Sequence, residues 1–207
     1  MQILLANTGK KFVREWIFRG IDLDIKSGER VVVLGPNGSG KSTFLQLMSG
    51  YVLPSVGTIR WLSNGVVVPD DEVFRHVSLA APYLEVPEEL SLNELVQFHF
   101  RFKPLLAGLT TADVILRSGL EKHADKPVRT FSSGMKQRVR LMLAFCSDTS
   151  LLLLDEPCSN FDRQAVDWYQ AIAAQFLGNR TVVVCSNHQD QEYTFCHRQL
   201  NVGEWKV

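Results

Sequence analysis

Short hydrophobic runs recur along the chain and predict the strands of a sheet. Strand-like patches, most of them rich in Val, Ile and Leu, occur at residues 21–25, 30–34, 76–80, 151–154, 181–185 and 199–202. Several of these runs are apolar without alternation, which is typical of strands buried on both faces in a parallel sheet covered by helices. Because helical stretches lie between the runs, the pattern predicts an α/β protein with a mostly parallel sheet core.

A second pattern covers residues 88–126, where the apolar positions follow helical spacing. It predicts one helix around Leu92 and Leu95 and another from Asp113 to Leu120. We interpret this segment as a helical lobe inserted into the sheet core. The expected organisation is one domain over residues 1–207, with the core at about 1–81 and 147–207 and the lobe at about 82–146.

Composition and charge exclude several classes of function. Lys plus Arg and Asp plus Glu both number 22 in the 207 residues, so no net charge draws the chain onto nucleic acid or anionic lipid. The longest aliphatic runs have strand length, far below the roughly 20 residues that span a bilayer. The N-terminal residues lack the pattern of a secretory signal, and the four cysteines show neither CxxC spacing nor the density of a disulfide scaffold. We therefore expect a cytoplasmic protein with reduced thiols.

A glycine-rich loop lies between the run at 30–34 and a helix-like segment that starts near Phe44. It fits the pattern GxxxxGK[ST], in which small residues let consecutive backbone N–H groups turn toward phosphate oxygens in front of a helix N-terminus. Lys41 is then expected to reach the β- and γ-phosphates, and the Ser42 hydroxyl to bind Mg²⁺. The expected nucleotide-binding residues are Gly35, Pro36, Asn37, Gly38, Ser39, Gly40, Lys41, Ser42 and Thr43.

Two adjacent carboxylates, Asp155 and Glu156, follow the apolar run at 151–154. At the carboxyl end of a parallel strand such groups face the ligand crevice, and strand alternation sends the two side chains to different surroundings. We expect Asp155 to hold the Mg²⁺ shell and Glu156 to orient or deprotonate the attacking water. The alternative is a strand that merely exits into a polar turn, and the phosphate loop upstream favours the catalytic interpretation.

The stretch at residues 130–138, with the sequence TFSSGMKQR, carries a resemblance to a known family. It resembles the signature of the ABC (ATP-binding cassette) ATPases, usually LSGGQ followed by a basic helix, and it precedes the acidic strand as in that family. The resemblance implies a P-loop NTPase fold with a small N-terminal antiparallel β region. It also implies that Ser132, Ser133 and Gly134 bind the γ-phosphate held by a second copy, although Ser133 replaces a glycine and Met135 a glutamine. In isolation, an ordinary helix cap explains this stretch equally well.

Three further positions extend the resemblance over most of the chain. Asp162 matches the aspartate of the family's D-loop, which touches the opposing subunit. His188 follows the run at 181–185 and matches the switch histidine that contacts the γ-phosphate. Phe12 resembles the aromatic residue that stacks on adenine, with Trp16 as a competing candidate.

The sequence departs from the family after the run at 76–80. The family usually places there a glutamine that binds Mg²⁺ and senses the γ-phosphate, whereas this chain continues with Ala81, Pro82 and Tyr83. Neither Ala nor Pro offers a side-chain ligand. Three explanations stay open: water completes the magnesium shell, hydrolysis is slower, or coupling to the membrane partner is built differently.

The resemblance implies an ATP-hydrolysing subunit that closes with a second copy of itself, or a related subunit, in a head-to-tail dimer around ATP and Mg²⁺. Such subunits drive transport through a separate transmembrane permease and lie in the cytoplasm, at the inner face of the cell membrane. The short chain is similar to ATPases of simple export systems, including that of cytochrome c maturation.

Two other classes of function remain as alternatives. A soluble ABC ATPase acting on ribosomes or DNA usually joins two cassettes or contains a long coiled coil, and neither pattern occurs in the sequence. A small-molecule kinase also uses a phosphate loop but does not need the turn at 132–134. The sequence contains no information on the transported substrate or the direction of transport.

Overall fold

The computed structural model describes residues 1–206 and divides them into two compact units. The core unit consists of residues 1–79, 150–156 and the segment from 179 onward. The helical unit consists of residues 80–149 and 157–178. Each unit is therefore assembled from segments that are distant in the sequence.

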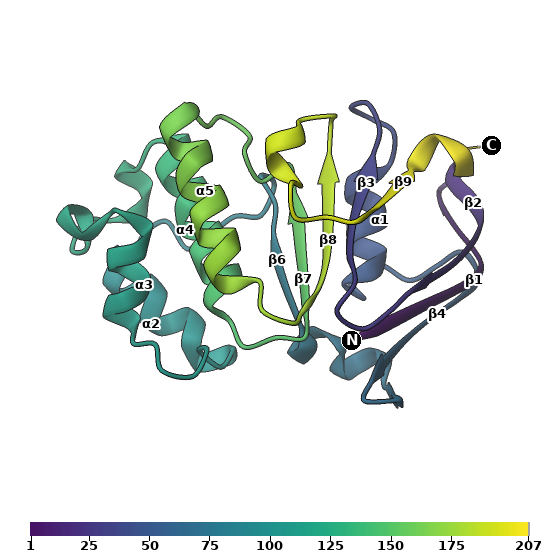
Figure 1. Cartoon of the computed structure of the whole chain (residues 1–207), viewed down its shortest axis with the longest axis horizontal. Coiled ribbons are helices and arrows are strands. Elements are labelled where there is room, and N and C mark those ends of the chain that lie inside the picture. Colours follow the sequence, from purple (N-terminus) through teal and green to yellow (C-terminus); the bar gives the residue numbers. More distant parts are fainter. Residues whose placement is uncertain (207) are drawn as a thin grey trace. The chain divides into compact units, whose positions relative to one another are not determined.

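The core unit contains the predicted parallel sheet (Figure 1). Parallel ladders join β3 to β8 and β9, and β7 to β8. Every residue of β7 and β8 is buried, which explains why their sequences are apolar without alternation. In sheet order the five strands are β6 (Val77–Ala80), β7 (Leu151–Asp155), β8 (Thr181–Ser186), β3 (Arg30–Leu34) and β9 (Arg198–Asn201).

A second, antiparallel sheet of the core unit confirms the small N-terminal β region. Two long strands pair along the first part of the chain, with register shifts near Thr8 and Lys10. In sheet order the strands are β2 (Glu15–Ile25), β1 (Gln2–Phe12), β4 (Val56–Ser63) and β5 (Val66–Val68).

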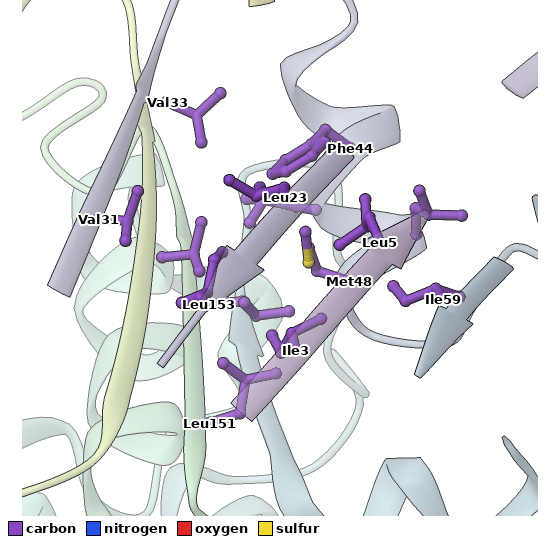
Figure 2. Packing of buried hydrophobic residues seen from close by; sticks show 14 of the residues in the cluster. Ile3, Leu5, Leu23, Val31, Val33, Phe44, Met48, Ile59, Leu151 and Leu153 are labelled. Carbon is purple, nitrogen blue, oxygen red and sulfur yellow. The ribbon is translucent and has the colours of Figure 1, made fainter. Parts of the chain in front are cut away.

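The hydrophobic core lies between these two sheets and surrounds α1 (Lys41–Met48). Figure 2 shows Phe44 and Met48 of α1 among side chains from strands of both sheets. The helix is apolar on more than one side because it contacts both sheets, and the Trp61 indole of β4 also donates to the Met48 carbonyl at 2.8 Å. Burial of this helix fixes the phosphate loop that precedes it.

The helical unit contains α2 (Leu92–Phe102), α3 (Thr111–Ser118), α4 (Ser133–Cys146) and α5 (Arg163–Phe176). Capping boxes start α2 at Ser91 and α3 at Thr110, so α3 begins two residues before the predicted Asp113. Gly119, with φ 70°, ends α3 in the left-handed conformation, before the predicted end at Leu120.

The strand predicted at 21–25 begins earlier, at Glu15, as β2. Short 3-10 helices account for two further differences from the predicted strands. The run predicted at 76–80 begins as β6 at Val77, since His76 still belongs to η1 (Asp70–His76). The run predicted at 199–202 ends at Asn201, because Val202 begins η5 (Val202–Trp205). Three further 3-10 turns are η2 (Glu121–His123), η3 (Val128–Thr130) and η4 (Asp190–Glu192).

None of the helices in residues 1–206 combines the length and the apolar character needed to cross a membrane.

A half-buried histidine in the helical unit makes stability depend on pH. His99 Nε2 lies 3.0 Å from the Ser147 hydroxyl, which itself donates to the Leu143 carbonyl, so the imidazole must donate to Ser147. Burial, with a smaller effect of nearby Lys103, lowers the pKa of His99 to about 4. The native state therefore holds the neutral ring over a pH range in which the unfolded chain already binds a proton.

We predict that replacing His99 reduces the loss of unfolding free energy that occurs as the pH falls from 7.5 to 5. Because the folded-state pKa lies below the unfolded value near 6.5, the contribution of His99 is present above pH 6.5 and is lost as the pH falls toward 4. Between pH 7.5 and pH 5 the loss is about 2 kcal/mol. Urea unfolding of wild type and His99→Gln at both pH values measures it, and parallel pH dependences of the two proteins would contradict the assignment.

Candidate active site

The phosphate loop joins β3 to α1 at the carboxyl end of the parallel sheet. Gly40 caps the N-terminus of α1 with φ 102°, and Gly38 has φ 74°, conformations that favour glycine. No acidic residue lies in the first turn of α1, so the positive end of the helix dipole is uncompensated there. The loop and helix form the anion-binding arrangement that the sequence predicts.

Close packing around the loop allows no side chain at two of its glycines. A Cβ on Gly40 would lie 2.5 Å from Cγ2 of Ile17, and one on Gly35 would lie 2.6 Å from the Ser39 hydroxyl. Ser39 is buried, and its hydroxyl has no hydrogen-bond partner within residues 1–206. An unpartnered buried hydroxyl at this position fits a ligand that brings hydrogen-bonding atoms of its own.

Lys41 links the loop to the acidic strand. Its ammonium donates to the carbonyls of Gly35 at 2.8 Å and Pro36 at 3.2 Å, and lies 3.4 Å from Oε1 of Glu156. The lysine side chain is 5% exposed, so these three oxygens replace most of its hydration.

The acidic pair is separated by a change of backbone conformation. Asp155 ends β7 in register with Cys185 of β8, and the Glu156 N–H donates to the Cys185 carbonyl at 2.9 Å. Glu156 itself lies beyond β7 with φ 43°, in the left-handed region. The two carboxylates thus have different surroundings as expected, but the cause is this turn and not strand alternation.

Asp155 carries a carboxylate that is almost fully buried, at 2% exposure. Neither of its oxygens has a hydrogen-bond partner of normal geometry among the described residues. Burial raises the pKa of Asp155 to about 6, Ser42 and Lys41 act in the opposite direction, and Glu156 adds to the rise. Two free carboxylate oxygens beside a serine hydroxyl are a suitable ligand pair for a hard cation such as Mg²⁺.

His188 lies in the same unit, in the loop that follows β8. Its side chain is exposed, and its φ of 57° is in the left-handed region, which non-glycine residues seldom adopt. The core unit thus contains the phosphate loop, the acidic pair and His188. Within residues 1–206 no three His, Cys, Asp or Glu side chains cluster as a metal site of their own.

The two aromatic candidates for adenine lie in the β1–β2 hairpin. Phe12 ends β1, is 46% exposed and has the Lys10 ammonium 5.0 Å from its ring centre. Trp16 contacts two cations, Lys11 at 5.4 Å and Arg19 at 4.9 Å. The hairpin residue placed against the phosphate loop is instead Ile17, which sequence analysis missed because an aliphatic residue in a strand carries no chemical signal.

The remaining predicted residues lie in the helical unit. Ser132 caps α4 and accepts the Met135 N–H at 3.3 Å, and Asp162 caps α5 and accepts the Ala165 N–H at 2.8 Å. A Cβ on Gly134 would meet only the Asn160 carbonyl, at 3.8 Å. The turn at 132–134 therefore forms the N-terminus of α4, with open space around Gly134. The Ser132 hydroxyl caps this helix, as the helix-cap interpretation expects.

The segment that lacks the family glutamine borders a cavity of about 410 Å³ in the helical unit. Ala81 is fully buried, whereas Tyr83 is 42% exposed. The cavity is lined by Pro82, Tyr83, Glu85, Glu88, Ser133, Lys136, Gln137, Arg140 and Asn160.

Comparisons with known proteins agree with this arrangement. The family model described as ABC transporter matches residues 18–159. The cytochrome c biogenesis ATP-binding export protein CcmA 2 of Cupriavidus metallidurans is 31% identical over 176 residues, 84% of this chain and 82% of the relative. The CcmA protein of Pseudomonas putida is 29% identical over 214 residues, 99% of each chain. A dimeric ATP-binding cassette solved in a post-hydrolysis state with ADP and Pi matches with a TM-score of 0.82 and 23% identity, over 96% of this chain and 93% of that chain.

A glycine-rich loop at a helix N-terminus, its lysine and a pair of carboxylates at the end of a parallel strand define a P-loop nucleoside triphosphatase. The family match covers more than half of the chain, and this chain belongs to the ABC transporter family as an ATPase nucleotide-binding domain. ATP binding and ATP hydrolysis are its general activities.

We predict that Asp155→Asn stabilises the nucleotide-free protein. Since the folded-state pKa is raised to about 6, the carboxyl group favours folding at low pH, and this contribution is lost as the pH rises through 6. Above that pH the buried charge costs about 3 kcal/mol, of which we expect the neutral amide to recover about 2 kcal/mol.

Urea unfolding at pH 8 without nucleotide or Mg²⁺ measures the gain. Asp71→Asn, an exposed aspartate of the same unit, is the matched control and should leave stability unchanged. Equal or lower stability of Asp155→Asn would show that the carboxylate is not strained by burial.

Proposed function

We propose that this chain is the ATP-hydrolysing subunit of an export system, works as a head-to-tail dimer and drives a separate transmembrane permease. Through that permease it lies at the cytoplasmic, inner face of the cell membrane. The proposal is supported by relatives named cytochrome c biogenesis ATP-binding export proteins and by a cassette solved as a dimer. We assign the whole chain to one ABC ATPase domain, with the core at about 1–81 and 147–207 and the helical lobe at about 82–146. The compact helical unit differs from this lobe in that it also contains residues 157–178.

The observation that carries the ATP-hydrolysing role is the position of the Lys41 ammonium between the loop carbonyls and Glu156. The phosphates of ATP carry several negative charges against the single charge of Glu156, so ATP competes with both the loop carbonyls and Glu156 for this ammonium. Backbone N–H groups of the loop between Asn37 and Thr43 bind the phosphates, as the helix terminus and open glycine conformations favour. Binding of substrate thereby frees the carboxylate for catalysis.

Ser42 and Asp155 are proposed to hold Mg²⁺. Asp155 fits this role because both of its buried oxygens lack partners within residues 1–206. When bound, Mg²⁺ neutralises charge that develops on the β- and γ-phosphates. Ala81 and Pro82 offer no ligand atoms in their side chains, so the side-chain ligands of Mg²⁺ would come from Ser42 and Asp155.

Glu156 orients the attacking water and accepts its proton, and His188 contacts the γ-phosphate. The left-handed backbone turns the Glu156 side chain toward Lys41 and away from the course of β7. A carboxylate that is 30% exposed, unlike buried Asp155, keeps access to water. This division leaves Asp155 for the metal and Glu156 for proton transfer.

The second copy contributes the turn at Ser132, Ser133 and Gly134, whose helix N-terminus attracts the γ-phosphate of the facing site. The first turn of α4 contains no acidic residue that would oppose this. Asp162 contacts the opposing subunit near the start of α5. Phe12 stacks on adenine, since almost half of its surface is open and its ring faces fewer cations than that of Trp16.

We predict that the permease co-purifies with the Glu156→Gln variant. The amide binds no proton from water, so the variant should bind ATP, hydrolyse it about a hundredfold more slowly and stay in the closed dimer. Affinity purification from detergent-solubilised membranes of the native host, with Mg²⁺ and ATP, followed by mass spectrometry, is expected to recover a polytopic membrane protein.

Lys41→Ala, which removes the phosphate contact, is the control and should recover less of it. Recovery of ribosomal or DNA-bound proteins alone would refute the transport function while leaving the ATPase intact. Recovery of no partner with either variant would also refute the permease assignment.

A further inference from the structure

A buried carboxylate four residues after His188 in the chain has no role in the mechanism described so far. Glu192, in η4 (Asp190–Glu192), is fully buried, and the hydroxyl of Ser186 donates to its Oε2 at 2.5 Å. Ser186, the last residue of β8, is also fully buried. Carboxylates are rarely placed in such surroundings unless hydrogen bonds hold them, so this contact is a specific feature of the loop.

The same hydroxyl also holds the backbone beyond His188. Ser186 Oγ accepts the Gln189 N–H at 3.1 Å, while the Glu192 N–H donates to the Gln189 carbonyl at 2.9 Å. Ser186 and Gln189 flank Asn187 and His188, whose side chains are both exposed. Asn187 and His188 thus lie in a short loop whose ends are held by three hydrogen bonds among Ser186, Gln189 and Glu192.

The backbone of His188 requires such a support. Its φ of 57° lies in the left-handed region, where a side chain is crowded by its own backbone. A residue in this conformation persists when its surroundings determine it more strongly than its own preference does. Glu192 also contributes, after burial and together with Asp155 and Glu156, to a raised pKa of the Cys185 thiol, so it lies within electrostatic range of the acidic pair.

We propose that Glu192 is a positioning residue for ATP hydrolysis, which acts through Ser186 to hold His188 in the conformation that contacts the γ-phosphate. The inference rests on the proposed role of His188. Glu192 does not touch the nucleotide. It fixes the direction of the imidazole, and the Ser186 hydroxyl transmits this constraint because it contacts both Glu192 and the Gln189 amide.

The test compares two variants that remove the hydrogen bond between Ser186 and Glu192 with one variant that keeps it. Glu192→Ala removes the acceptor and Ser186→Ala the hydroxyl, whereas Glu192→Gln keeps a carbonyl oxygen that accepts from Ser186. We expect the two alanine variants to lower kcat of ATP hydrolysis by about 10- to 100-fold, since small misplacements of a catalytic group have effects of this size. KM should change less than about threefold, and Glu192→Gln should stay within about threefold of wild type.

A double-mutant cycle distinguishes positioning from general support of the fold. If Glu192 acts through His188, adding Glu192→Ala or Ser186→Ala to His188→Ala should lower kcat no further. Glu72→Ala, an exposed glutamate of the same unit, is the matched control and should match wild type. If Glu192→Ala does not fold, Ser186→Ala decides the question alone, because it removes a single hydroxyl.

Each other outcome counts against the inference. Unchanged kcat in both alanine variants, a loss confined to KM, or a full additional loss in the His188→Ala background would overturn the positioning role and leave the proposed function standing. A His188→Ala variant as active as wild type would overturn the role of His188 and this inference together.

Discussion

The active site depends on where one ammonium group is held. Lys41 is nearly buried at the start of α1 and is surrounded by the Gly35 and Pro36 carbonyls and by Glu156. A buried cation is stable only where oxygens replace its hydration, so the loop must close around the lysine and the end of β7 must bring Glu156 to it. The core beneath α1 keeps both in place, because Phe44 and Met48 are packed against two sheets (Figure 2).

Much of the fold could be predicted from the sequence, because its strands are buried on both faces. The runs at 30–34, 151–154 and 181–185 correspond to β3, β7 and β8 with differences of at most one residue. The predictions failed at ends set by local hydrogen bonds. The capping box at Thr110 moved the start of α3, and a 3-10 turn ended β9 before Val202. Such contacts depend on single side chains and leave no periodic signal.

The site was predictable where a motif fixes chemistry and less so where backbone geometry does. The loop at 35–43 and the acidic pair could be identified from residue types, whereas the turn at Glu156 could not, since a glutamate rarely adopts positive φ and its residue type does not indicate it. Ile17 and Glu192 were missed for a related reason. One is an aliphatic residue whose position matters only through its contact with the phosphate loop, and the other is an acid whose burial cannot be read from its neighbours.

The composite, two-copy site is the central claim, and a mixing experiment tests it most directly. Lys41→Ala disables the phosphate loop, and Gly134→Asp places a negative charge at the turn proposed to face the γ-phosphate, so each variant alone should be inactive. In an equal mixture half of the dimers combine both variants and contain one intact site of two, so phosphate release should return to about a quarter of the wild-type rate. A mixture as inactive as its components would contradict the head-to-tail arrangement.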